Sequence, residues 1–414
     1  MTQTWAPDTE ANTGQRGHWL NAERVRAYSW IIVGIFAIVL AVWTIRSLPD
    51  LVDPRGKPLG YDFMAYWSTA RLALAGHAAD AFDWQAIVPV QHAAVPFRAE
   101  YWFPWHYPPT FLLAVAPLGL MPYPVALAVF LSATGALYAA LIPRLIPDRR
   151  FWIAAAAPAA LLNLLDGQNA FLTVALAGFA LLWLERWPVA AGVLVGLLAL
   201  KPHLAPLFPV ALLAGGHWRA IAAAAVTVAT LVFASLAAFG WVSWLAFLAH
   251  LPVSQAMADA GAVPWDTMPS PYVFVLSLGG PVAAARVAQA IVAVFAAGCV
   301  WSVWRRRAAP FEARTASLMT GSLLVSPYLF YYDLLWLVPA VAWLALLGLR
   351  SGFRRGEREV LLFAWSVPAI MQPVQMLTHV QLGFPAVLLL LLLAVCRASS
   401  FTDSSVLSTQ HSNG

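Results

Sequence analysis

Charged residues are scarce in this sequence. Asp, Glu, Lys and Arg together make up only 10% of the 414 positions, whereas 61% of the positions are hydrophobic. So few charges cannot cover a water-soluble protein of this length, and long apolar runs recur from near Tyr28 to Cys396. The composition excludes an ordinary soluble fold and indicates an all-α polytopic membrane protein.

Cysteine is rare as well. The two cysteines, Cys299 and Cys396, both fall inside apolar runs, which argues against a disulfide framework and against a cysteine metal site. The net charge of +5 does not indicate nucleic-acid binding, because the basic residues lie in short loops between apolar runs. We therefore expect no nucleic-acid partner.

The apolar runs predict about twelve membrane spans in one transmembrane domain, residues 28–397. The spans are placed at 28–48, 124–143, 151–165, 170–185, 188–200, 203–215, 218–240, 282–304, 314–327, 334–349, 359–372 and 382–397. A further apolar piece, 109–121, contains Pro117, which favours a re-entrant segment over a span. The first span is interpreted as a retained anchor after a cytoplasmic tail over 1–27, because no small-residue cleavage site follows it.

The basic residues decide the orientation. With an inner N-terminus and with 109–121 not crossing, 17 of the 24 Lys and Arg residues lie on the inner side, as the positive-inside rule requires. We therefore expect a bacterial inner (plasma) membrane protein with cytoplasmic termini and with its active site on the periplasmic or extracellular side. That side carries a helical first external loop over 49–123 and a second large loop over 241–281. A disordered cytoplasmic tail is expected over 398–414.

A carboxylate at the outer boundary is the first candidate site residue. Asp62 begins a stretch of good helix formers, so an N-cap alone would explain it. Its neighbours favour a functional role in addition to capping, because Tyr66 and Arg71 share the predicted helix while His106 and Tyr107 follow in the same loop. Aromatic rings beside a carboxylate suit sugars, which stack on rings and give their hydroxyls to acids. An interfacial aromatic belt is the alternative.

Two short outer turns add polar side chains that membrane insertion does not need. Gln168 and Asn169 lie in a sequence that an ordinary turn would also explain, although a turn does not need the glutamine. Lys201 and His203 lie between two spans. A snorkelling side chain is the plain interpretation of the lysine, and a site for a phosphate group is the functional one.

The segment after Pro327 is unusually rich in tyrosine for a membrane boundary. It ends in Tyr332 and Asp333, where helix capping would be enough to account for the aspartate. The outer segments contain no His-X-X-His, Cys-X-X-Cys or Asp-X-Asp pattern, and a glycine-rich phosphate loop is also absent from the sequence. We therefore expect no metal site and no cofactor.

These segments, in this order, resemble glycosyltransferase family 87, a family of multi-spanning GT-C transferases. The resemblance runs from about Gly60 to Pro339 and rests on Tyr61-Asp62-Phe63 with Tyr66 and Arg71, Tyr107-Pro108-Pro109 with Ala116-Pro117-Leu118, Gly167-Gln168-Asn169, Leu200-Lys201-Pro202, and Ser326-Pro327 with Tyr332-Asp333. It implies a GT-C fold that moves a hexosyl unit, typically mannosyl, from a polyprenyl-phosphate donor to a lipid or glycan acceptor among membrane lipids.

The resemblance also implies residue roles. Asp62 would be the catalytic base that takes the proton of the acceptor hydroxyl. The leaving phosphate is already an anion and needs positive charge, which Lys201, His203 and Arg71 would supply. One displacement would invert the anomeric centre. The sugar or the acceptor would be bound by polar and aromatic side chains of the outer face: Tyr66, His106, Tyr107, Gln168, Asn169, Tyr332 and Asp333.

Two other classes of protein share a topology of about a dozen spans. A secondary transporter would place its ionisable residues near mid-membrane and often carries an internal repeat, whereas here these residues gather at the outer boundary. A polymer ligase that uses undecaprenyl-linked substrates would need a long external loop late in the chain. Besides the first loop, 241–281 is the only large one.

Overall fold

The computed structural model describes residues 18–410, and the regular structure in that range is helical apart from one β-bridge between Val52 and Pro58. Six helical segments are long and apolar enough to cross a membrane: α1 (Ala22–Ser47), α5 (Tyr123–Leu145), α10 (Trp218–Asp259), α12 (Val282–Arg305), η7 (Tyr331–Trp336) continuing into α14 (Leu337–Ser351), and α15 (Glu357–Thr378). The predicted all-α polytopic membrane class is confirmed. Residues 1–17 of the predicted N-terminal tail and residues 411–414 of the predicted C-terminal tail lie outside the described part.

Shorter apolar helices complete the bundle. They are α4 (Pro109–Val115) with η2 (Ala116–Leu120), α7 (Ala170–Trp183), α8 (Pro188–Leu197) with η4 (Leu198–Leu200), and α16 (Gly383–Gln410), whose apolar part ends at Ser399. The remaining helices are α2 (Tyr61–Leu74), η1 (Ala78–Phe82), α3 (Trp84–Ala94), η3 (Arg149–Ala155), α6 (Pro158–Asp166), η5 (Pro202–Leu204), α9 (Leu207–Gly215), η6 (Trp265–Thr267), α11 (Pro271–Ser277) and α13 (Phe311–Val325).

Some of the predicted membrane segments differ from a simple span. The segment 151–165 is not one helix: η3 ends at Ala155 and α6 begins at Pro158, because proline lacks the N–H that a continuous helix would use. The piece 109–121 forms a seven-residue α-helix followed by a five-residue 3-10 helix. Its length of about 20 Å is shorter than a hydrocarbon core of roughly 30 Å, and its re-entrant character stays a prediction.

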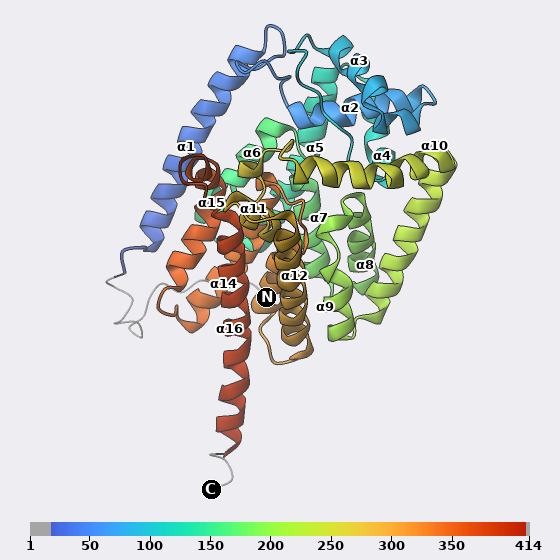
Figure 1. Ribbon diagram of the computed structural model, residues 1–414. Helices are drawn as coiled ribbons and strands as arrows, with labels where there is room; N and C mark the ends of the chain where they lie inside the picture. Colours follow the sequence, from blue (N-terminus) through green and yellow to red (C-terminus); the bar gives the residue numbers. More distant parts are fainter. Residues whose placement is uncertain (1–17, 411–414) are drawn as a thin grey trace.

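The second predicted external loop, 241–281, is largely helical. The backbone of Gly240 adopts φ 75° and ψ 166°, a conformation that favours glycine, and it kinks α10 at this point. Figure 1 shows α10 rising along the edge of the bundle and then turning to lie across one end of it, where it packs against α4 and η1. At the other end of the chain, α16 ends at Gln410, within 398–414, the segment predicted to be a disordered tail.

Of three hydrophobic cores, the two larger ones adjoin, since Leu172 packs against both. The larger core is built around α7, α13 and α14, and α13 is buried on nearly all sides. The smaller core joins α2 to α3, α4 and α5 and contains many aromatic rings, among them Phe63, Tyr66 and Trp105. The start of α2 and the turns after α6, α8 and α13 therefore converge at the end of the bundle that carries the loop 49–123, which is predicted to be external (Figure 1).

Candidate functional site

The backbone before α2 fixes where Asp62 lies. Gly60 is the residue before the helix and adopts a left-handed conformation with φ 66°. The Tyr123 hydroxyl donates to the carbonyl oxygens of Leu59, at 2.6 Å, and of Gly60, at 3.1 Å, which ties this turn to α5. Asp62 lies in the first turn of α2, and its side chain reaches another element instead of capping its own helix. An N-cap role therefore does not account for Asp62.

The turn between α6 and α7 approaches the start of α2 closely. Gly167 ends α6 with φ 70°, and a Cβ atom at this position would lie 2.6 Å from the Cβ of Phe63. A residue with a side chain would clash there and would also be strained at that φ. The glycine thus allows the next residue, Gln168, to reach the first turn of α2.

Gln168 connects four side chains by hydrogen bonds. Its Nε2 donates to Asp62 Oδ2 at 2.9 Å and to the Tyr332 hydroxyl at 3.0 Å. Its Oε1 accepts from the Tyr66 hydroxyl at 2.5 Å and from the Tyr107 hydroxyl at 3.2 Å. Gln168 is only 4% exposed. Because every polar atom of its amide is used, the amide orientation is fixed and so is the carboxylate that it contacts.

Lys201 lies in a buried ion pair beside the glutamine. Its Nζ donates to Asp333 Oδ1 at 2.6 Å and to Asn169 Oδ1 at 3.2 Å, and it lies 5.0 Å from the centre of the Tyr332 ring. The side chains of Lys201 and Asp333 are 2% and 0% exposed. We call the eight side chains joined in this way the polar cluster: Asp62, Tyr66, Tyr107, Gln168, Asn169, Lys201, Tyr332 and Asp333.

The polar cluster sets the proton affinity of Asp62. Burial raises the pKa of this carboxyl group to about 6, and the hydrogen bond from Gln168 together with the positive charges of Lys201 and Lys57 only partly offsets that rise. A carboxylate with such a pKa is ionised at neutral pH and binds a proton more strongly than an ordinary aspartate does. These are the properties that a general base needs near neutral pH.

A second carboxyl group lies next to the polar cluster. Asp166, at the end of α6, is 2% exposed, and Tyr61 and Tyr331 lie close enough to act on its pKa. The hydroxyls of these two tyrosines lie 3.1 Å from each other. Burial, and then the negative charge of Asp62, raise the pKa of Asp166 well above its ordinary value. The negative charge of Asp62 therefore acts on a second buried carboxyl group beside the polar cluster.

Three sequence-predicted site residues lie apart from the polar cluster. Arg71 is at the far end of α2, where its Nη1 donates to the Gly119 carbonyl at 3.2 Å. His106 points toward α10, with its Nδ1 3.2 Å from His250 Nε2 and 2.9 Å from Ser254 Oγ. His203 follows Lys201 in η5 and is half-buried.

Sequence reasoning missed several groups that surround Asp62. Asp166 and its two tyrosine partners were not among the candidate site residues, and neither was Lys57, whose positive charge acts on Asp62. Lys57 Nζ lies over the rings of Tyr61 and Tyr101, at 4.7 Å and 5.2 Å. In the sequence, the available signal was the position of Lys57 five residues before the aspartate, which also fits an ordinary loop lysine.

The fold and the site together define a class: a polytopic helical membrane protein with a buried carboxylate, amide and tyrosine site at one end of its bundle. Comparison with protein families then identifies it more closely. The model of glycosyltransferase family 87 matches residues 105–327, more than half of the chain, and the chain belongs to this family. The chain is thus an integral membrane glycosyltransferase.

No curated protein and no solved structure matches the chain. The family match includes Gln168, Asn169 and Lys201, but Asp62 and Asp333 lie outside it. The position of these two carboxylates in the site is therefore an observation from the geometry, because each contacts a residue that the match includes.

Proposed function

We propose that this glycosyltransferase moves a hexosyl unit, most simply a mannosyl unit, from a polyprenyl-phosphate donor to a lipid or glycan acceptor. Asp62 acts as the general base and the reaction inverts the anomeric centre. The observation that carries the proposal is the contact between Asp62 and Gln168 at 2.9 Å, because it fixes the carboxylate at a place lined by tyrosine rings.

The proposed base step uses the oriented carboxylate. Asp62 Oδ2 accepts from Gln168, and a carboxylate has about four lone-pair sites, so room remains for one more donor. An acceptor hydroxyl that donates to Asp62 would lose its proton as its oxygen attacks the anomeric carbon. The bond from that carbon to the phosphate oxygen breaks in the same displacement, and the lipid phosphate leaves as an anion.

The proposed stabilisation of the leaving phosphate comes from the charge of Lys201, and His203, two residues further along the chain, adds a hydrogen-bond donor in our proposal. Without a donor, Asp333 and Asn169 hold the ammonium group in place. Because the site is buried, a positive charge there acts on an anion more strongly than it would in water. Arg71, which binds the Gly119 carbonyl, holds α2 on η2 and is not part of this phosphate site in our proposal.

The sugar would lie against the tyrosines of the polar cluster. Tyr66 and Tyr107 are 2.8 Å apart through their hydroxyls, and their rings meet edge to face. Hydroxyls of this kind, with the carboxamide groups of Gln168 and Asn169, are the partners that sugar hydroxyls use, while the rings cover apolar sugar faces. His106 would contact the acceptor further out, next to the second half of α10.

The proposal includes the fold type and the orientation in the membrane. We propose a GT-C arrangement of about twelve membrane segments, including the shorter helices, with the polar cluster on the periplasmic or extracellular side of a bacterial inner membrane. The excess of Lys and Arg in the loops at the other end of the bundle supports this orientation. Helices shorter than a full span fit if they tilt or if the bilayer thins around them.

Purified protein in liposomes tests this function. With polyprenyl-phosphate mannose labelled in the sugar and extracted membrane lipids as acceptors, we expect a labelled lipid or glycan product and free polyprenyl phosphate. The same labelled mannose supplied as a nucleotide sugar should give no product. Transfer from the nucleotide sugar alone would overturn the donor class, and uptake of a labelled solute that depends on Asp62 would instead support a transporter.

The pH profile of the transfer should reveal the base. A base must be unprotonated in the free enzyme, so kcat/KM should be constant at neutral pH and fall about tenfold per unit below the pKa of about 6 given for Asp62. The measurement is kcat/KM between pH 4.5 and 8, with protein that has been returned to pH 7.5 as a control for loss of folding. A fall that begins only near pH 4 would contradict the raised pKa.

A carboxylate in place of the Gln168 amide should disturb the base directly. Gln168→Glu removes the amide donor to Asp62 and places a negative charge beside it, which raises the pKa of Asp62 further. We expect the acidic limb of the pH profile to move upward by about one unit or more. The matched control is Gln85→Glu. Gln85 is exposed and lies on α3, within the same 49–123 segment as Asp62. An equal shift in both variants would show a general charge effect.

A further inference from the structure

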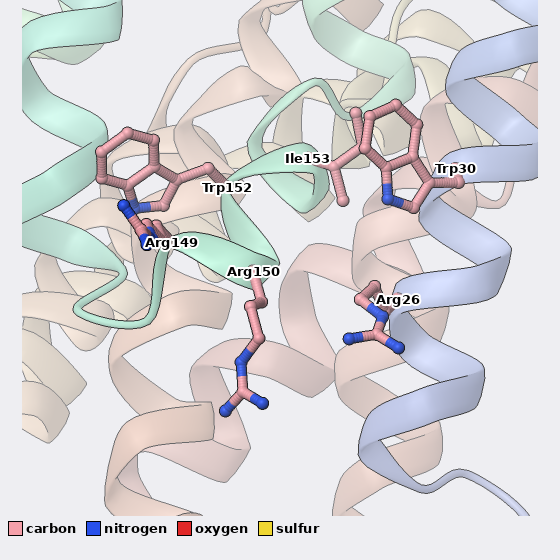
Figure 2. Close-up of a pocket in the computed structure, with 6 residues that line it drawn as sticks. All are labelled: Arg26, Trp30, Arg149, Arg150, Trp152 and Ile153. Carbon is pink, nitrogen blue, oxygen red and sulfur yellow. The ribbon is translucent and has the colours of Figure 1, made fainter. Parts of the chain in front are cut away.

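A basic cavity lies between α1 and η3, far from the polar cluster. It has a volume of about 480 Å³ and is lined by three arginines, two tryptophans and an isoleucine: Arg26, Trp30, Arg149, Arg150, Trp152 and Ile153. Figure 2 shows Arg26 and Trp30 on α1 facing Arg150 and Ile153 on η3 across the cavity. The proposed glycosyl transfer does not use these residues.

The cavity lies at the opposite end of α1 from the catalytic loop. Arg26 is in the second turn of this 26-residue helix, whereas Asp62 belongs to the loop that follows its last residue, Ser47. A helix of that length extends about 39 Å, more than the roughly 30 Å of a hydrocarbon core. The cavity and the polar cluster therefore face opposite surfaces of the membrane.

The two side chains that α1 contributes to the cavity lie at different depths, in the order of a lipid's headgroup and its acyl chains. On α1, Trp30 follows Arg26 by four residues and lies one turn further into the apolar stretch. On η3, Trp152 follows Arg149 by three residues, and its Nε1 donates to the Ile146 carbonyl at 2.9 Å. Tryptophan prefers the level of the membrane interface, and arginine prefers the phosphate level.

The cavity carries an excess of positive charge. Arg150 donates to Asp148, with 2.7 Å between Nη2 and Oδ2. Among residues 18–399, whose side chains the structure describes, neither Arg26 nor Arg149 has a carboxylate within 4.0 Å. Two guanidinium groups that lie beside the same cavity suit the oxygens of a phosphate group, since guanidinium donors match phosphate geometry.

We propose that this cavity binds the phosphate headgroup of an anionic glycerophospholipid from the leaflet opposite to the catalytic site. Arg26 and Arg149 hold the phosphate oxygens. Trp30, which is 61% exposed, and Ile153 line the apolar side, where the acyl chains continue along α1. The apolar wall favours a lipid over free phosphate, and the bound lipid holds α1 against η3 on that side of the membrane.

The test measures lipid binding to the full-length protein in detergent. Phosphatidylglycerol is titrated and bound lipid is counted by native mass spectrometry. In the variant Arg26→Gln/Arg149→Gln we expect roughly thirtyfold weaker binding, while Arg26→Lys/Arg149→Lys should recover most of the affinity. The control Arg305→Gln/Arg307→Gln removes the same charge from another loop on that side of the membrane and should bind like the wild type.

Several outcomes would overturn the proposal. Equal losses in the cavity variant and in the control would mean that only general charge attraction acts. Unchanged binding in the cavity variant would mean that the cavity is not the site. Displacement of the lipid by millimolar inorganic phosphate would assign the cavity to free phosphate instead. Thermal unfolding in neutral phosphatidylcholine micelles shows that each variant is folded, so that a loss of binding cannot be a loss of structure.

Discussion

Asp62→Asn should lower kcat for sugar transfer by about 10²- to 10⁴-fold, the range that a positioned general base contributes. Asparagine has the same shape as aspartate and its Oδ1 can still accept from the Gln168 amide, so the turn between α6 and α7 keeps its contact with α2. It cannot take a proton from the acceptor hydroxyl. The measurement is the initial rate of transfer from labelled polyprenyl-phosphate mannose at pH 7.5.

The matched control for this variant is Asp50→Asn. Asp50 is an exposed aspartate in the same external loop, and its replacement removes the same charge without touching the polar cluster. We expect the transfer rate of the control to equal that of the wild type, and we expect donor affinity to survive in both variants. If Asp62→Asn transferred sugar at a rate within a few-fold of the control, Asp62 would not be the base.

Lys201→Met should be strongly destabilising. The change removes the partner that lies 2.6 Å from Asp333, which is fully buried. Removing one partner of a buried ion pair typically destabilises a protein by about 3–5 kcal/mol. The free energy of unfolding can be measured in mixed micelles of a mild detergent and a denaturing one. The control is Lys57→Met, which removes the same kind of charge from the more exposed lysine near Asp62.

A second substitution separates the structural role of Lys201 from its proposed catalytic role. Lys201→Met/Asp333→Asn removes both charges, so we expect most of the lost free energy of unfolding to return. Transfer should stay low, because the leaving phosphate still lacks its positive charge. If the double variant regained stability and activity together, Lys201 would be only a structural residue, and the phosphate site would have to be sought elsewhere.

The sequence was sufficient to predict the class of fold, because long apolar runs separated by short basic loops are typical of polytopic helical membrane proteins and of few other proteins. It was less informative on individual spans. Length and hydropathy do not show that Pro158 begins a new helix after η3 or that Gly240 kinks α10 across the end of the bundle. Both are local changes of backbone conformation inside a continuous apolar stretch, and an averaged hydropathy profile does not detect them.

The candidate site could be predicted as a set of residues but not as a set of contacts. Asp62 and Gln168 were both placed on the outer side, yet only helix packing brings residues 106 positions apart into a hydrogen bond. Lys201 and Asp333 were given different roles, whereas they form one ion pair. In the sequence, Asp166 fits an ordinary turn. In the fold it is buried, and two tyrosines from distant segments, Tyr61 and Tyr331, act on its pKa.

Asp166 lies close enough to Asp62 for their charges to interact. The anomeric configuration of the product therefore tests directly whether one carboxyl group or two take part in the reaction. Two carboxyl groups can support retention through a covalent glycosyl intermediate, whereas one base supports inversion. The anomeric configuration of the product that the wild-type enzyme forms from a β-linked polyprenyl-phosphate mannose can be determined by nuclear magnetic resonance. With Asp62 as the base of a single displacement, the product is entirely α-linked. A β-linked product would contradict that mechanism.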